Sequence, residues 1–290
     1  MNIKINRLNI LKSGFFACIC MGVFLVCCNK DSGSNNNGVN KFINAKWKIS
    51  DPDSEYSSFE FNKDGNYIVI ENVSTGSKRS AGLKRSQILI SGMKRFAESN
   101  LSPIHFGTYK IEGNTIILSG FGTINIISIT AEEFCFSFVL ESTGKEWNYV
   151  ATTEDQGQTS SRTEMLCRTW KLNKVVFDES FIPEELKEYL KKEYGANWKA
   201  EIEKEYNEEL AGSIILFSKA GTYLILYQGE DEEAGLSEWK WANKEETAIY
   251  YSWDNWKDDW EDNIVSIKDL KSTSLKMQEE GMIYEMTLVK

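Results

Sequence analysis

Hydrophobic and polar residues alternate along much of the chain after residue 45. In residues 58–61 every second side chain is aromatic, Lys63-Asp64-Gly65 then supplies a turn, and a second apolar stretch begins at Tyr67. A period of two places alternate side chains on opposite faces of a strand. A short polar turn with glycine between two such stretches indicates a hairpin. The pattern therefore predicts an all-β protein built from antiparallel hairpins.

Four short motifs occur twice, in the same order, in the two halves of the chain. Such an internal repeat indicates two copies of one fold. We place the copies at residues 44–152 and 166–290, with a polar linker at 153–165. The paired segments are 47–49 with 170–172, 61–67 with 217–223, 107–111 with 237–241, and 125–129 with 263–267.

Each copy is expected to contain eight short strands. An even number of strands separated by turns favours an up-and-down barrel or a sandwich, and closing the sheet removes exposed edges. After the strand at Trp47 and the first hairpin, the strands of the first copy are predicted at 105–111, 114–119, 123–129, 133–140 and 145–151.

The repeated motifs resemble those of a known group of domains. They are a tryptophan that opens the first strand, a Phe-x-x-x-Gly-x-Tyr hairpin, a central Tyr-Lys or Trp-Lys strand and a closing Ile-x-x-Leu pattern. Together they look like the lipocalin-like domains of bacterial lipoproteins. The resemblance implies two tandem eight-stranded antiparallel up-and-down barrels, each with an interior suited to a small apolar ligand.

Aromatic residues at equivalent positions of the two copies are the candidates for such an interior. They are Tyr67, Tyr109, Tyr223, Trp239 and Trp241. Small barrels can equally be filled by their own side chains. In that case the protein is a scaffold at the cell surface that binds a glycan or another protein.

The second copy carries a charged insertion at 181–210 that favours two helices. Pro183 suits a first helical turn, Gly195 breaks the segment, and Asn197 can cap a second helix. Apolar residues recur at steps of three and four, and we expect this face to close a barrel mouth, with a docked partner as the alternative. The face consists of Leu186, Tyr189, Leu190 and Tyr194.

Trp253, Trp256 and Trp260 follow one another among carboxylates near a predicted hairpin. Aromatic faces beside carboxylates suit sugar binding, and hard oxygen ligands suit calcium. The spacing lacks the Asp-x-Asp-x-Asp pattern of calcium loops. These residues are therefore a candidate surface aromatic patch, with no metal predicted.

The N-terminus resembles the leader of an exported lipoprotein. Basic residues precede an apolar stretch too short to span a bilayer, as in a secretory signal. Leu25-Val26-Cys27-Cys28 resembles a lipobox, which implies cleavage of residues 1–27, acylation (palmitate) of Cys28 and a flexible tether at 28–43. The expected location is the outer membrane, on the periplasmic or cell-surface side. A plain cleaved signal is the alternative.

Composition narrows the function further. A net charge of −10 in 290 residues argues against a nucleic-acid partner, which requires clustered Lys and Arg. The single histidine removes His-cluster metal sites, and motifs of hydrolases, metalloproteases and phosphate loops are absent. We therefore expect no enzyme and no cofactor.

The expected partners are the membrane, through the acyl chains, and a small hydrophobic ligand or glycan. Cys135 and Cys167 remain in the mature chain. Cys135 is expected to be a buried free thiol, and a disulfide between the two in an oxidising compartment is the alternative.

Overall fold

The computed structural model describes residues 39, 42–72, 104–154, 160–181, 183–227, 234–252, 256–257, 260–279 and 281–289. The leader, most of the tether including Cys28, and a basic segment at 78–95 lie outside these residues. No helix in the described part of the chain is long and apolar enough to cross a membrane.

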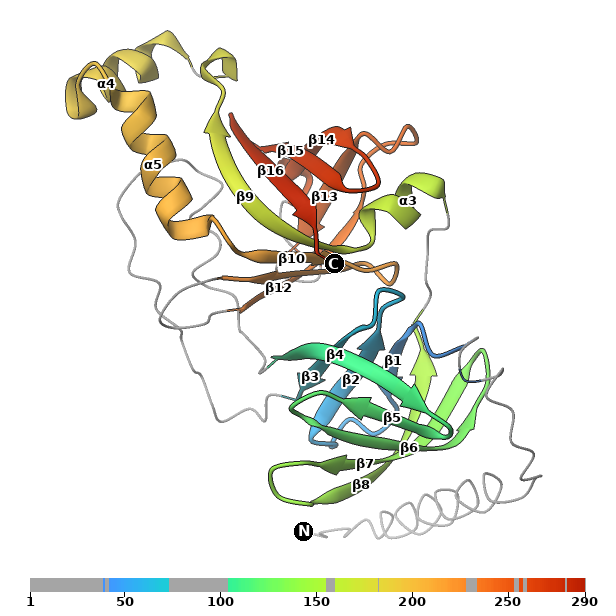
Figure 1. Ribbon diagram of the computed structural model, residues 1–290. Coiled ribbons are helices and arrows are strands. Elements are labelled where there is room, and N and C mark those ends of the chain that lie inside the picture. Colours follow the sequence, from blue (N-terminus) through green and yellow to red (C-terminus); the bar gives the residue numbers. More distant parts are fainter. Residues whose placement is uncertain are drawn as a thin grey trace, which may run out of the picture.

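Eight antiparallel strands of the first copy close into barrel 1, each strand pairing with its neighbours in sequence and β1 pairing with β8 (Figure 1). The interior is lined by the alternate apolar residues of each strand, as a period of two requires. The strands are β1 (Lys46–Ile49), β2 (Tyr56–Phe61), β3 (Asn66–Glu71), β4 (Ile104–Glu112), β5 (Thr115–Leu118), β6 (Gly122–Ile129), β7 (Glu133–Leu140) and β8 (Glu146–Thr153).

Barrel 2 repeats this order, with β9 closing on both β10 and β16. The prediction of two tandem eight-stranded antiparallel up-and-down barrels is therefore confirmed. Short helices α3 (Ser161–Leu166), η2 (Glu179–Phe181) and η3 (Trp260–Asp262) lie outside the sheet. The strands are β9 (Thr169–Phe177), β10 (Ile214–Phe217), β11 (Thr222–Leu226), β12 (Ala234–Trp241), β13 (Ala248–Ser252), β14 (Ile264–Leu270), β15 (Ser274–Glu279) and β16 (Met282–Leu288).

The two copies share their local hydrogen bonds as well as their strand order. The indole of Trp47 donates to the carbonyl four residues before it, and the indole of Trp170 does the same. Gly65 and Gly221 occupy the same hairpin position with φ of 87° and 83°, a backbone conformation that glycine adopts without strain. The repeated motifs thus recur because each solves the same folding problem.

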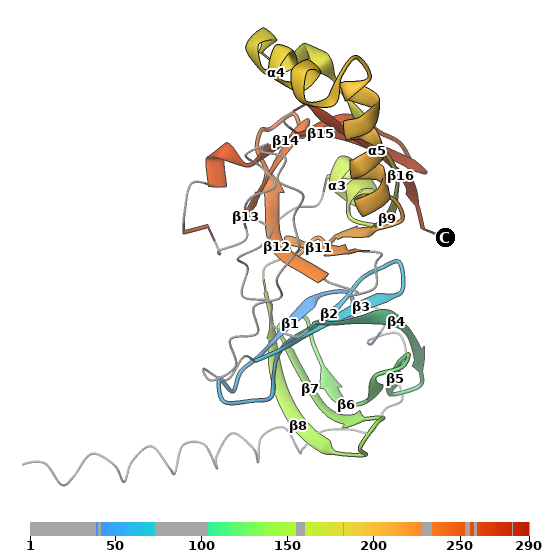
Figure 2. The same ribbon diagram turned by 90° about the vertical axis from the view of Figure 1, so that its left-hand side faces the viewer.

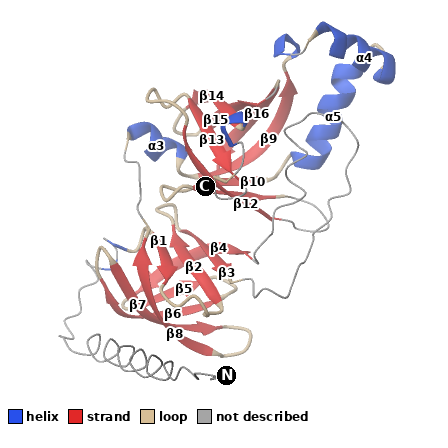
Figure 3. Ribbon diagram, turned by 180° about the vertical axis from the view of Figure 1, so that it is seen from behind, coloured by secondary structure: helices blue, strands red, loops and turns tan. Residues whose placement is uncertain are grey.

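The predicted helical pair is present as α4 (Glu184–Tyr194) and α5 (Trp198–Leu210). Figure 3 shows both helices beside barrel 2, on the side away from barrel 1. The expectation that the apolar face of α4 closes a barrel mouth is wrong in part. Leu190 is buried, but Tyr189 and Tyr194 are 56% and 36% exposed.

Helix α5 instead covers an open strand edge. β9 pairs with β10 only through Thr169–Lys171. On that side of β9, the backbone amide and carbonyl groups of the residues up to Phe177 therefore need other hydrogen-bond partners. The Asn207 side chain accepts a hydrogen bond from the Val175 amide and donates one to its carbonyl, each at 2.8 Å. Glu203 accepts from the Phe177 amide at 2.9 Å. Side chains of α5 therefore replace a neighbouring strand.

The two barrels pack directly against each other (Figures 1 and 2). Ile68 of β3 meets Leu216 and Leu224 of barrel 2, and all three are almost fully buried although they point out of their own barrels. Beside this apolar contact, Thr222 donates to Glu60 and Thr169 donates to Asp64, each at 2.7 Å. The interface combines apolar burial with hydrogen bonds from β9 and β11 of barrel 2 to β2 and the following turn of barrel 1.

Candidate functional site

Aromatic side chains fill the interior of barrel 1. Their rings contact one another in edge and stacked geometries, with centroids 4.4 Å apart for Phe134 and Phe136 and 5.2 Å for Phe59 and Phe136. Such packing is that of a hydrophobic core. Eight aromatic side chains of this interior are at most 2% exposed. They are Trp47, Tyr56, Phe59, Phe61, Tyr67, Phe134, Phe136 and Phe138.

The interior of barrel 2 contains a carboxylate among phenols. Glu279 lies two residues after Met277 and four after Leu275 on β15, so it shares their face of the strand. Because both of those residues are buried in the barrel, Glu279 points inward. Tyr251 donates a hydrogen bond of 2.6 Å to its Oε1. Tyr223 and Tyr284 lie close enough to Glu279 for its charge to raise the pKa of both phenols. We call Glu279, Tyr223, Tyr251 and Tyr284 the barrel 2 cluster.

Burial sets the protonation of this cluster. It raises the pKa of both Tyr223 and Tyr284 well above 10, and the Glu279 charge acts in the same direction. Burial and Glu279 together raise the pKa of Tyr251 also. The phenols therefore stay protonated and serve as hydrogen-bond donors and acceptors at neutral pH.

Part of the barrel 2 cluster remains accessible. Tyr284 and Glu279 are partly exposed although they point inward, whereas Tyr223 and Tyr251 are 9% and 3% exposed. Tyr206 of α5 and Tyr227, after β11, lie near Tyr284. One carboxylate and one phenol of the barrel 2 cluster are therefore partly accessible from outside the barrel.

Of the five predicted interior residues, Tyr223 belongs to this cluster and the others hold loops in place. Tyr67 donates to the Ser119 carbonyl at 3.2 Å, and burial raises its pKa to about 12. Trp241 donates to the Thr163 hydroxyl at 2.9 Å. Their polar atoms are engaged within the chain.

Tyr109 and Trp239 make equivalent bonds in the two barrels. Tyr109 donates to the Asn62 carbonyl at 3.1 Å, and Trp239 donates to the Ser218 carbonyl at 2.9 Å. Burial raises the pKa of Tyr109 to about 12. Each aromatic residue fastens the first hairpin of its barrel, which accounts for their recurrence at matching positions.

The predicted aromatic patch is brought together in part. Trp256 and Trp260 make an edge contact with centroids 5.1 Å apart, while Trp253 lies outside the described residues. The Lys240 ammonium lies 4.2 Å and 3.5 Å from the two ring centroids. Such cation–π contacts occupy the ring surfaces that a sugar would stack on.

Other candidate groups are placed as follows. Cys135 is buried in barrel 1, Cys167 is partly buried beside barrel 2, and these two described cysteines form no disulfide. Burial raises the pKa of the Cys167 thiol. His105 pairs with Glu71 at 2.7 Å. Within the described ranges, no three His, Cys, Asp or Glu side chains are grouped to hold a metal ion.

No protein-family model matches the sequence. No curated protein matches it either. Among solved structures, the chain is similar to a lipocalin-like protein from Bacteroides uniformis, with 13% sequence identity and a TM-score of 0.26, over 43% of this chain and 99% of that chain. The strand order and closure of the barrels, and not this similarity, establish their fold.

Proposed function

We propose that this chain is a non-enzymatic binding protein of the bacterial envelope whose second barrel holds a small, mainly apolar ligand that carries a hydrogen-bond donor. The observation that carries the proposal is the partly exposed Glu279 inside barrel 2, with Tyr251 bonded to it. A carboxylate in such an interior is stabilised by hydrogen-bond partners. Its presence in an otherwise apolar interior fits a site in which a few polar groups orient a ligand.

The two barrels then have different roles. The aromatic core of barrel 1 suits a structural support, while barrel 2 supplies the site. The ligand donor, a hydroxyl or an amine, would bond to Glu279, and the surrounding Met277, Met282 and Met286 would contact its apolar body. The glycan alternative receives less support, because Lys240 covers Trp256 and Trp260.

Attachment to the outer membrane through acyl chains on Cys28 completes the proposal. It rests on the sequence of the leader and on the polar tether behind it. Several acyl chains on one residue anchor a protein stably, and the acidic body would not bind an anionic membrane by itself. The barrels would then be displayed a short distance from the lipid surface.

Displacement of the dye Nile red by two matched compounds tests the ligand chemistry. The proposal predicts that 1-decanol, which has a hydroxyl donor, displaces the dye at lower concentration than decyl methyl ether, which has none. Glu279→Gln should reduce that difference, because the amide oxygen is a weaker acceptor than the carboxylate. Tyr67→Phe, at the position in barrel 1 equivalent to Tyr223, is the control and should leave the difference intact. Equal displacement by both compounds from the native protein would refute the proposed site.

A further inference from the structure

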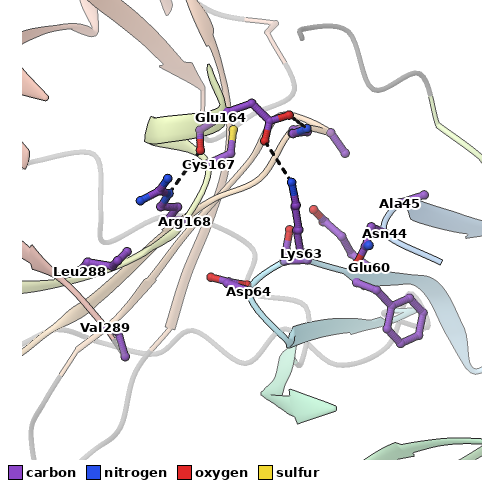
Figure 4. Close-up of a pocket in the computed structure, with 14 residues that line it drawn as sticks. Asn44, Ala45, Glu60, Lys63, Asp64, Glu164, Cys167, Arg168, Leu288 and Val289 are labelled. Atoms are coloured by element: carbon purple, nitrogen blue, oxygen red, sulfur yellow. Dashed lines mark hydrogen bonds and ion pairs between the residues drawn. The ribbon is translucent and has the colours of Figure 1, made fainter. Parts of the chain in front are cut away.

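A cavity lies between the two barrels, outside both barrel interiors. It has a volume of about 300 Å³ and is lined from barrel 1 by the end of β2 and the following hairpin, and from barrel 2 by α3, the β10–β11 turn and the C-terminal residues (Figure 4). Ligand pockets begin at about this size. The cavity therefore suits a small molecule.

Two residues that line the cavity each carry a buried polar atom that lacks a hydrogen-bond partner. Glu60 is 2% exposed, and its Oε2 accepts from Thr222 at 2.7 Å. Its other oxygen, Oε1, and the Asn62 side-chain nitrogen are buried with no hydrogen-bond partner among the described residues. Leaving a buried donor and a buried acceptor unsatisfied is unfavourable. Both groups line the same cavity.

Strand geometry explains why these two groups lie together. Glu60 and Asn62 are two positions apart, on either side of the inward Phe61, so both point out of barrel 1. Barrel 2 covers that face, which converts an ordinary surface carboxylate into a buried one. Burial raises the pKa of Glu60, against the opposing effects of the Lys46 charge and of the Ser218 and Thr222 hydroxyl groups.

The charges around the cavity balance. Three acidic residues, Glu60, Asp64 and Glu164, face three basic residues, Lys63, Arg168 and Lys219. On the rim, Glu164 pairs with both lysines. Figure 4 shows Lys63 extending from the barrel 1 hairpin toward Glu164, with Glu60 beside it. A lining that is neutral as a whole but contains both signs complements a zwitterion better than a net ion.

We propose that this cavity binds a small zwitterion of the α-amino-acid type, whose ammonium group donates to Glu60 Oε1 and whose carboxylate accepts from the Asn62 amide. The two unpartnered atoms are one acceptor and one donor, and the ligand supplies the complement of each. The apolar side chains of Ala45, Leu288 and Val289, which also line the cavity, would contact the ligand side chain. This site is separate from the barrel 2 cluster.

Calorimetric titration of the purified protein with three probes tests the proposal. L-leucine has both charges, leucinamide keeps only the ammonium group, and N-acetyl-leucine keeps only the carboxylate. We expect L-leucine to bind most tightly and N-acetyl-leucine to bind least. Glu60→Gln should weaken L-leucine binding by about 10- to 100-fold, because a charge-assisted hydrogen bond is lost.

Glu112→Gln is the matched control, because it makes the same change at an exposed carboxylate of barrel 1 that pairs with Lys110 and does not line the cavity. It should change L-leucine affinity within about threefold. Circular dichroism and the melting temperature establish that each variant is folded. Absence of binding by all three probes, which would mean that the cavity holds only water, overturns the proposal. Equal binding by the native protein and a folded Glu60→Gln variant also overturns it. Nile red displacement should be the same in both variants, which separates this site from the one in barrel 2.

Discussion

Replacing Asn207 with alanine tests whether α5 substitutes for a strand in the wall of barrel 2. The substitution leaves the amide and the carbonyl of Val175 without the partners that now lie at 2.8 Å. Val175 is 0% exposed, so water cannot readily replace them. Each unsatisfied buried group costs about 1–3 kcal/mol. Alanine recovers about 0.6 kcal/mol as a better helix former, which leaves a net loss of about 1.5–5 kcal/mol.

Urea unfolding followed by tryptophan fluorescence measures this loss. Amide hydrogen exchange should locate it, with faster exchange at Val175. Glu208→Ala on the exposed side of the same helix is the control, because it removes only an ion pair of 3.9 Å with Lys204. The control should cost less than about 0.5 kcal/mol. A cost for Asn207→Ala no larger than that of the control, with unchanged exchange at Val175, would refute the structural role assigned to α5.

Three further predictions concern pH, the interface and the anchor. Burial raises the pKa of Glu60 above its ordinary 4.5, so the folded protein binds this proton more tightly than the unfolded chain does. The free energy of unfolding contributed by Glu60 therefore falls as pH rises from 4.5 through the raised pKa. Glu60→Gln should therefore gain stability over native protein as pH rises through this window in urea titrations; a constant difference would contradict the assignment. Leu224→Ala, at a fully buried interface position, should cost about 2–4 kcal/mol in urea unfolding and separate the unfolding of the two barrels, whereas a change below about 0.5 kcal/mol would count against the barrel contact. Cys28→Ser should move the expressed protein from the detergent phase to the aqueous phase and abolish palmitate labelling; retention in detergent would refute the anchor.

The strands could be predicted from the sequence because the two faces of a strand alternate within a few residues. The predicted segments 123–129 and 133–140 nearly coincide with β6 and β7. The repeat then gave the second barrel, since Gly65 and Gly221 occupy the same turn. This part of the fold depends on local pattern, and local pattern is what a sequence displays.

The barrel 2 cluster could not be predicted in the same way. Glu279 and Tyr251 come from β15 and β13, which both pair with β14, and only the assembled, curved sheet brings their side chains within 2.6 Å. A glutamate in the inward register of β15 was the available signal, but the register of a strand is certain only once its partners are known.

The contacts of barrel 1 with barrel 2, and of the helices with barrel 2, also could not be predicted from the sequence. Glu60 points out of barrel 1, a position that the alternation of the strand predicts to be exposed. It is buried only because barrel 2 packs over it. Similarly, the periodic apolar face of α4 predicted packing for Tyr189, which is exposed. The neighbouring α5 packs instead, because the open edge of β9 requires hydrogen-bond partners that Asn207 and Glu203 supply.

Native mass spectrometry of the purified protein, as isolated and after incubation with 1-decanol, tests the central claim most directly. The claim is that barrel 2 holds a ligand while barrel 1 is a filled core. It predicts one bound molecule per chain and a smaller bound fraction for Glu279→Gln, with Tyr67→Phe unchanged. An unliganded mass under both conditions, or two bound decanol molecules per chain, would contradict it.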